Sequence, residues 1–249
     1  MLNFSSISNN SGLGKALRLP LKLVPRNARL PILQGPLRGY WWIAASANHG
    51  CWLGSYELEK QLAFASHIRH GAVIYDVGAN VGFYTLLASE KAGSSGEVHA
   101  FEPLPENLSF LWRHVRLNRL SNVAVHAAAV SDVAGKLRFS RTGSRSTGHL
   151  DDRGEMQVGA VTLDQFVFEQ GHAPPSLVKI DVEGAEGRVL RGAQRLLHSK
   201  RPVIFLATHG KQAHQECCEF LLSMAYQVEG VTGEPDGPTD ELVCFPRAS

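Results

Sequence analysis

The chain has 249 residues, of which 44% are hydrophobic, enough for one α/β domain or two small ones with a large buried core. Its formal net charge of +2 predicts neither nucleic-acid binding nor general membrane binding. No apolar stretch is near the roughly twenty residues that a membrane-spanning helix needs.

The amino-terminal segment is basic. Residues 1–40 contain six lysines or arginines and no acid, which is typical of a solvated extension or of a contact with anionic lipid or glycan. A signal peptide is not expected, because no long apolar stretch follows Lys15, the first basic residue. The four cysteines lack metal-ligand spacing and are predicted to be reduced thiols, which favours a cytoplasmic protein.

The first predicted elements precede the main domain. Residues 40–53 are aromatic and apolar, and are predicted to pack as a lid or flank over that domain. Apolar residues at helical spacing then predict a helix from Ser55: Leu58, Leu62, Ala65 and Ile68. We therefore expect a basic extension and helical cap at 1–70, and a ligand-binding domain at 71–249.

Strands and helices alternate through the rest of the chain. Strands are predicted at 72–77, 97–102, 123–130, 136–140, 176–182, 202–208, 225–230 and 241–245. Helices are predicted at 82–91, 105–118 and 212–224, and after Thr162 and Glu183. Residues 141–160 show no period and are predicted to be a surface loop. This alternation indicates βαβ units and a largely parallel sheet.

The stretch YDVGANVGFYT, residues 75–85, places two glycines after a predicted strand. Without Cβ atoms, Gly78 and Gly82 let the chain turn tightly and approach a ligand, although a tight turn without a ligand has the same pattern. In doubly wound sheets, ligands lie beyond the carboxyl ends of the strands. The spacing is not the dinucleotide fingerprint, since Asn80 stands where a second glycine would admit a pyrophosphate.

Two acids near this turn indicate the kind of ligand. Asp76 precedes the glycines, where a carboxylate would repel a phosphate but suits an ammonium group. Glu102 ends the next strand and can accept hydrogen bonds from both hydroxyls of a ribose. A ligand with a ribose, a positive aminoacyl group and no phosphate fits S-adenosylmethionine better than NAD.

Four motifs, in order, resemble the FkbM family of S-adenosylmethionine-dependent methyltransferases: DVGANVGFYT, FEPLPENLSFLWRHVRLN, TLDQF and LVKIDVEGAEGRVLRGA. The resemblance covers about residues 50–230. It implies a class I (Rossmann-like) α/β methyltransferase fold, with a doubly wound, mostly parallel seven-stranded sheet and an antiparallel last strand. It also implies O-methylation, often of a sugar hydroxyl on a glycolipid, polysaccharide or natural product.

The resemblance also implies which residues bind S-adenosylmethionine. The turn on the methionine side of the cofactor would be formed by Asp76, Gly78, Asn80 and Gly82. Thr85 would meet the cofactor carboxylate near a helix N-terminus, and Glu102 would bind the ribose. The adenine would lie beside Pro103 and Leu104, with Ser131 and Asp132 at its edge. For Asp132, an ordinary loop acid is the alternative.

The motif KIDVEGAE supplies candidate catalytic residues. Lys179, Asp181 and Glu183 occupy alternate positions at a strand end, which sends them to one side of the sheet. Charged residues are unusual in a central parallel strand, so we expect Asp181 to contact the cofactor ammonium or orient the acceptor hydroxyl, and Lys179 to stabilise an alkoxide. An ion-pair cluster that holds the loop is the alternative.

His209 comes after the fifth main strand, and a neutral imidazole suits a general base near pH 7. Many family members carry an acid two residues earlier, where this chain has Ala207. Without that acid to orient the ring, the role of His209 is open. Asp181, Glu183 and His209 can also be read as a divalent-metal site, but their spacing matches no metal motif, so we predict no metal.

The sequence therefore predicts an S-adenosylmethionine-dependent O-methyltransferase acting on a small-molecule or glycan acceptor, and not on nucleic acid. Trp41, Trp42 and Trp52 would suit a carbohydrate, because aromatic faces stack on sugar rings. The basic segment also predicts a peripheral contact with an anionic membrane or glycolipid. A nucleotide-dependent oxidoreductase and a catalytically silent cofactor-binding protein are the alternatives.

Overall fold

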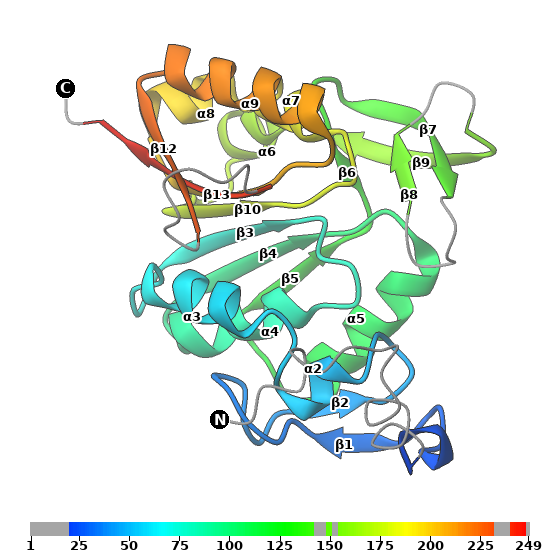
Figure 1. Ribbon diagram of the computed structural model, residues 1–249. Helices are drawn as coiled ribbons and strands as arrows, with labels where there is room; N and C mark the ends of the chain where they lie inside the picture. The colour runs from blue at the N-terminus through cyan, green and yellow to red at the C-terminus, as the bar shows by residue number, and fades with distance from the viewer. Residues whose placement is uncertain (1–19, 142–147, 151–153, 232–239, 248–249) are drawn as a thin grey trace.

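Figure 1 shows the computed structural model, which describes residues 20–141, 148–150, 154–231 and 240–247. A seven-stranded sheet forms its centre, in the order β12-β13-β11-β10-β3-β4-β5. In chain order, these strands are β3 (Val73–Val77), β4 (Glu97–Phe101), β5 (Val123–His126), β10 (Leu177–Ile180), β11 (Val203–Ala207), β12 (Tyr226–Gly230) and β13 (Glu241–Pro246). The pairs from β5 to β11 are parallel, whereas β13 is antiparallel to both β11 and β12. The predicted mostly parallel sheet with an antiparallel last strand is confirmed.

Helices cover both faces of this sheet (Figure 1). One side carries α3 (Leu58–Ser66), α4 (Phe83–Ala92) and α5 (Pro105–Leu117), and the other carries α6 (Leu163–Phe168), α7 (Glu186–Arg191), α8 (Gln194–Ser199) and α9 (Lys211–Ser223). Successive strand residues point to opposite faces, so each strand supplies two hydrophobic cores. In β10, Val178 and Ile180 pack on the side of α6 to α9, whereas Leu177 packs on the side of α3 and α4.

Two predictions in the middle of the chain are wrong. The predicted strand 123–130 is divided, because β5 ends at His126 and β6 (Ala129–Val130) joins a second sheet. The predicted loop 141–160 contains β8 (Gly148–Leu150) and β9 (Met156–Val161), which both pair with β7 (Gly135–Arg141). An apolar run has the same pattern whether it stays in one sheet or passes to another, so periodicity could not locate this change.

The helix predicted after Glu183 is likewise divided, into α7 and α8. Gly192 lies between them, and a Cβ atom there would be 2.0 Å from the carbonyl oxygen of Ser131. A glycine is therefore required for this close contact between the helix pair and the end of β6. The predicted cap at Thr162 is confirmed, since its hydroxyl accepts a hydrogen bond from the amide of Gln165 at 3.0 Å.

The segment before β3 is only partly helical. It contains the 3-10 helix η2 (Pro20–Leu23), the paired strands β1 (Arg29–Pro31) and β2 (Trp41–Ile43), then α2 (Gly50–Leu53) and α3. We call residues 20–57 of this segment the cap. Trp42 and Trp52 are buried in the core that also contains Leu86 of α4, so they cannot stack on a sugar as predicted, while Trp41 is 45% exposed. The division at residues 70 and 71 stays a prediction.

The buried face of α3 also differs from the prediction. The structure buries Lys60, Gln61 and Phe64, whereas Leu62 is 48% exposed. Lys60 is drawn inward by ion pairs with Glu57 and with Glu241 of β13. Of the predicted face, Ala65 and Ile68 still pack against the core, partly buried.

His114 of α5 contacts both the cap and residues 78–82, which we call the glycine turn. It is fully buried, its ring stacks on Trp42, and its two nitrogens contact the backbone amide of Ile43 at 3.1 Å and the carbonyl of Val81 at 2.8 Å. Burial lowers the pKa of His114 to about 4, because the charged form would lose its hydration. His114 is therefore neutral in the folded protein at pH 7.

We expect the free energy of unfolding to fall as the pH drops from about 6.5 to 4. The unfolded chain protonates His114 at the upper value and the folded chain only at the lower, so the unfolded state binds more protons in between. The loss from this residue approaches about 3 kcal/mol at the acid end. Urea titrations at several pH values should show that His114→Gln has a shallower dependence than the wild type. His198→Gln, which changes an exposed histidine, should leave the slope unchanged, and equal slopes in all three proteins would contradict the prediction.

Within the part of the chain that the structure describes, no helix combines the length and apolar character needed to cross a bilayer. All four cysteines carry free thiols. The compartment of the protein stays a prediction.

Candidate functional site

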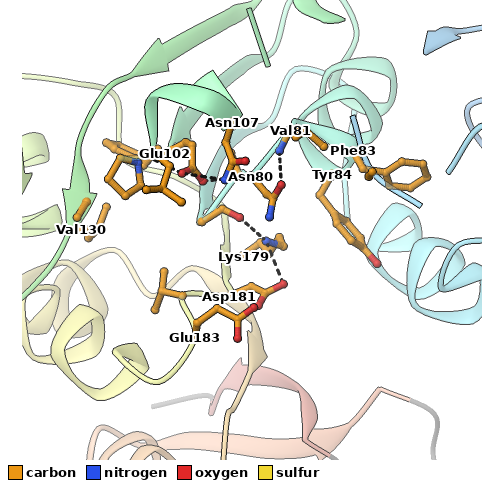
Figure 2. A pocket seen from close by; sticks show the side chains of 18 of the residues that line it. Asn80, Val81, Phe83, Tyr84, Glu102, Asn107, Val130, Lys179, Asp181 and Glu183 are labelled. Carbon is orange, nitrogen blue, oxygen red and sulfur yellow. Dashed lines mark hydrogen bonds and ion pairs between the residues drawn. The ribbon is translucent and has the colours of Figure 1, made fainter. Parts of the chain in front are cut away.

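A cavity of about 340 Å³ opens at the carboxyl ends of β3, β4 and β10. Figure 2 shows that Asn80, Glu102 and Lys179 surround its centre. Its wall comes from segments far apart in sequence. They are residues 78–81 with the start of α4, residues 101–104 with Asn107, residues 128–130, Phe139 of β7, Lys179 with residues 181–183 and 185, and several residues of the cap. This is the edge at which a doubly wound sheet binds its ligands.

The glycine turn has left-handed backbone at three positions, Gly78, Asn80 and Gly82, with φ values of 77°, 51° and 98°. A Cβ atom on Gly78 would lie 1.8 Å from the carbonyl oxygen of Asp181, and one on Gly82 would lie 2.5 Å from Leu111. The sequence argument assigned these glycines to a close approach by a ligand. The structure shows that contacts within the protein already require them. Gly82 lies outside the wall of the cavity, whereas Gly78 and Asn80 line it.

Glu102 connects the glycine turn to the start of α5. Its carboxylate accepts hydrogen bonds from the amides of Asn80 at 2.9 Å and Leu104 at 2.8 Å, and from the side chain of Asn107 at 3.2 Å. Burial raises the pKa of Glu102, and these three hydrogen bonds oppose the increase. Although it is only 4% exposed, the residue lines the cavity together with Pro103. Asn107 was not recognised in the sequence, and its position five residues after Glu102, in the first turns of a helix, was the available signal.

Lys179 holds together the ends of β3 and β10. Its ammonium group donates to the carbonyl of Gly78 at 3.2 Å and lies 3.3 Å from Asp76. It also lies 3.6 Å from Asp181 (Figure 2). Burial opposes its charge, but the two carboxylates raise the pKa of Lys179 above its usual value. One of these contacts, to Gly78, is a hydrogen bond, and the other two are ion pairs within the protein. The arrangement therefore fits a structural role for Lys179, in which it joins the ends of β3 and β10, better than the predicted stabilisation of an alkoxide.

Asp76 and Thr85 lie behind the wall of the cavity. Both side chains are fully buried, and the hydroxyl of Thr85 donates to Asp76 at 2.6 Å. Neither residue belongs to the cavity lining. Asp76 thus holds Lys179 and Thr85 in place, and direct contacts of Asp76 and Thr85 with a cofactor stay predictions from the sequence.

Asp181 and Glu183 come after β10 and line the cavity, as does Lys179. Burial opposes ionisation of Asp181, but the nearby cations, Lys179 first, hold its pKa below the usual value. Its side chain keeps 30% of its surface exposed, so this carboxylate is accessible from the cavity. Of the predicted catalytic residues, Asp181 and Glu183 are placed to contact a bound molecule.

His209 has acidic neighbours that its sequence context did not reveal. Nδ1 lies 2.8 Å from Glu186, and Nε2 lies 3.7 Å from Asp181 and 3.5 Å from Glu183. The hydrogen bond to Glu186, with the charges of all three acids, raises the pKa of His209 to about 9, although burial opposes this. The predicted neutral base at pH 7 does not fit, because the imidazole is then protonated. Glu186 can thus orient the imidazole in place of the acid that many family members carry at the position of Ala207.

Ser131 and Asp132 do not reach the cavity wall. Ser131 is fully buried, and the carboxylate of Asp132 pairs with Arg188 at 2.9 Å and Arg191 at 3.7 Å. Burial opposes ionisation of Asp132, but the hydrogen bonds from Arg188 and Ser131 and the charge of Arg188 hold its pKa below the usual value. The wall at this point is instead formed by the apolar segment 128–130 and by Phe139 of β7. The sequence analysis missed Phe139 because its segment was expected to be a peripheral strand.

The cap completes the wall with Ser46, Ala47, Asn48, Cys51 and Tyr56. Beside them, the hydroxyl of Tyr84, another wall residue, donates to Glu57 at 2.8 Å. The five cap residues precede the recognised motifs, and the available signal was the prediction that residues 40–53 pack over the domain. No group of three histidine, cysteine or acidic side chains in the described ranges is arranged to hold a metal ion.

The sheet order and the position of the cavity define the class of the fold, which is that of class I methyltransferases. The structure is similar to precorrin-6y C5,15-methyltransferase from Geobacter metallireducens, with a TM-score of 0.50 and 16% identity, covering 76% of this chain and 88% of the other. It is also similar to a putative rRNA methylase from Clostridium thermocellum, with a TM-score of 0.51 and 13% identity, covering 77% and 94%. At these identities, the likeness establishes the fold alone.

The chain belongs to the FkbM methyltransferase family. The family model described as the methyltransferase FkbM domain matches residues 76–228, more than half of the chain. Among its relatives, 31-O-demethyl-FK506 methyltransferase FkbM of Streptomyces tacrolimicus is 33% identical over 162 residues, covering 51% of this chain and 61% of the relative. Hexuronic acid methyltransferase AglP of Haloferax volcanii is 32% identical over 136 residues, covering 53% and 54%. The chain therefore spans about half to three-fifths of the length of these relatives.

Proposed function

We propose that this protein transfers the methyl group of S-adenosylmethionine to a hydroxyl of a sugar-containing acceptor, in a glycan, glycolipid or secondary metabolite. The observation that carries the proposal is the cavity itself. It combines a buried carboxylate suited to a ribose, Glu102, with accessible carboxylates at Asp181 and Glu183. Its cation, Lys179, is already paired with Asp76 and Asp181, which disfavours the binding of a pyrophosphate.

The residues present fit this cofactor. Pro103, Leu104, Val130 and Phe139 offer an apolar wall for an adenine next to Glu102, whose carboxylate faces the cavity. Negative charge at Glu183 suits the ammonium group of the same molecule. When bound, S-adenosylmethionine supplies an electrophilic methyl group on a good leaving group, so the protein needs only to align the acceptor and remove its proton.

Asp181 is our candidate for orienting the acceptor hydroxyl and receiving its proton. It is accessible, its ionised form is favoured by Lys179, and Glu183 lies beside it in the wall. His209, protonated at neutral pH, contributes positive charge 3.7 Å from Asp181 and so keeps both carboxylates in position. His209 is therefore proposed as a positioning residue.

The relatives support the acceptor class. One is named for methylation of a demethylated FK506 and one for methylation of a hexuronic acid. Both names describe hydroxyl- or sugar-bearing small molecules or glycan units, and neither describes a nucleic acid. Free thiols at all four cysteines agree with the proposal of a reducing, cytoplasmic compartment.

The function is tested first by binding. S-adenosylhomocysteine at about a hundred times its dissociation constant should add roughly 2.7 kcal/mol to the stability of the folded protein, seen as a rise in melting temperature. NAD at the same concentration should cause no rise. A rise with NAD and none with S-adenosylhomocysteine would contradict the proposal and favour the oxidoreductase alternative.

The second step is transfer of a labelled methyl group to a panel of uronic acids, oligosaccharides and macrolides. Asp181→Asn should lower turnover on any accepted substrate about 100-fold or more while leaving the melting shift with S-adenosylhomocysteine in place. Unchanged turnover would remove Asp181 from the mechanism. Binding without transfer to any member of the panel would favour the silent binding protein.

A further inference from the structure

A second groove lies between the cap and α5, outside the cavity described above. It has a volume of about 370 Å³ and is lined by Arg29 of β1, Ile43 of β2, and Arg113, Arg116 and Leu117 of α5. The three arginines come from segments more than eighty residues apart in sequence, and all three side chains are exposed. The lining thus combines two apolar residues, Ile43 and Leu117, with three arginines.

Among the described residues, the ion pairs involve other side chains, so none of them neutralises these arginines. The guanidinium group of Arg113 lies 5.3 Å from the centre of the Phe110 ring. The dipole of α5 accounts for basic residues near its C-terminal end. It does not account for Arg29, which comes from a strand of the cap. Guanidinium groups bind phosphate oxygens through two parallel hydrogen bonds, which makes such a group of arginines suited to a phosphate.

The charge of the surrounding chain is also one-sided. Six lysines or arginines and no acid precede Glu57, which leaves 19 basic and 23 acidic residues in the rest of the chain. Arg119, just after α5, adds a further cation near the groove. The cap therefore has a positive net charge, and the rest of the chain has a negative one. Such a separation of charge orients a protein with its positive part toward a negative surface.

Exposed apolar side chains gather on the same elements. Of seven large hydrophobic residues exposed in the described ranges, four belong to the cap or to α5: Leu23, Leu33, Trp41 and Trp112. Exposed tryptophan and leucine beside arginine are typical of proteins that lie at a membrane interface, where the ring or chain enters the headgroup region and the cations meet lipid phosphates.

We propose that the cap and the groove dock this protein on a membrane surface that contains anionic phospholipids, with a headgroup phosphate held among Arg29, Arg113 and Arg116. The proposal does not depend on methyl transfer. The cap links the two sites, because Ile43 lines the groove, Ser46 lines the cavity, and the hydroxyl of Ser46 donates to the carbonyl of Ile43 at 2.8 Å. Docking through this face places the cavity near molecules carried in the lipid.

The test is co-sedimentation of the full chain with vesicles. Binding is expected to vesicles of phosphatidylcholine mixed with phosphatidylglycerol, and not to phosphatidylcholine alone. It should weaken strongly with added salt, since exposed charges are screened beyond about 8 Å at physiological ionic strength. Arg113→Gln with Arg116→Gln should lower the partition coefficient roughly 30-fold, because each arginine at an anionic surface contributes about fivefold.

The matched control is Arg69→Gln with Lys200→Gln, which removes the same charge from exposed positions away from the groove. This variant should bind the mixed vesicles nearly as the wild type does, and melting temperatures should show that both double variants are folded. If both double variants lost vesicle binding to the same extent, the net charge alone would explain the loss, and the assignment to the groove would be overturned. Binding to both vesicle types, or to inorganic phosphate with no vesicle binding, would overturn the membrane proposal.

Discussion

Lys179→Met is expected to lower the free energy of unfolding by about 3–5 kcal/mol. The side chain of Lys179 is 5% exposed, and its partner Asp76, in the neighbouring strand β3, is fully buried. Methionine fills a similar volume but leaves the Asp76 carboxylate without its cation, and a buried unpaired charge is far more costly than the pair is favourable. Chemical denaturation of both proteins measures the difference.

Lys60→Met is the matched control. Lys60 also lies 5.5 Å from the centre of the Tyr84 ring, at the same distance as Lys179, but its partners Glu57 and Glu241 each keep 35% of their side-chain surface exposed. Water can replace the lost cation there, so we expect a loss of only about 1 kcal/mol. Adding Asp76→Asn to Lys179→Met should restore part of the lost stability. Equal losses for the two lysine variants, with no recovery in the double variant, would show that Lys179 does not stabilise the fold through Asp76.

Glu102→Gln is expected to weaken binding of S-adenosylhomocysteine about 100-fold. The carboxylate accepts from the amides of Asn80 and Leu104 and, in the proposed complex, from ribose hydroxyls. A glutamine side chain has one acceptor oxygen, so its NH₂ group would face one of these donors, and two hydrogen bonds to a charged acceptor would be lost or weakened. Calorimetric titration of both proteins gives the ratio of dissociation constants.

Asp132→Asn provides the contrast, because the family resemblance assigns Asp132 to the same cofactor. In the structure, its carboxylate pairs with Arg188 and Arg191 and lies outside the cavity lining. We therefore expect an unchanged dissociation constant in this variant. A loss comparable to that of Glu102→Gln would mean that the adenine edge is bound where the sequence placed it and not at residues 128–130.

The main sheet was predictable because its signals are local. Apolar runs such as 72–77 and 202–208 lie between helical patterns, and their order along the chain implies parallel pairing. The second sheet was not predictable, because β8 and β9 are stabilised by pairing with β7 and not by a strong pattern of their own.

The candidate site was likewise predictable only in part. Gly78, Asn80 and Glu102 could be recognised from their positions at strand ends, and the structure brings them to one cavity with Asp181 and Glu183. The protonated state of His209 could not be foreseen, because Glu186 is 23 residues away in sequence and becomes its neighbour only when α7 packs beside the end of β11.

By itself, the sequence determined the class of fold, the family and the edge of the sheet at which a ligand binds, since these depend on periodicity and on residue types at strand ends. Only the tertiary structure decided what each charged group does there. In the structure, Lys179 and Asp76 form a buried ion pair, His209 has a raised pKa, and Asp132 pairs with Arg188 outside the cavity. These properties depend on neighbours from distant segments, because such neighbours set the pKa and the accessibility of a side chain. The tertiary structure also brought Arg29 to α5, forming a groove that no stretch of sequence contains.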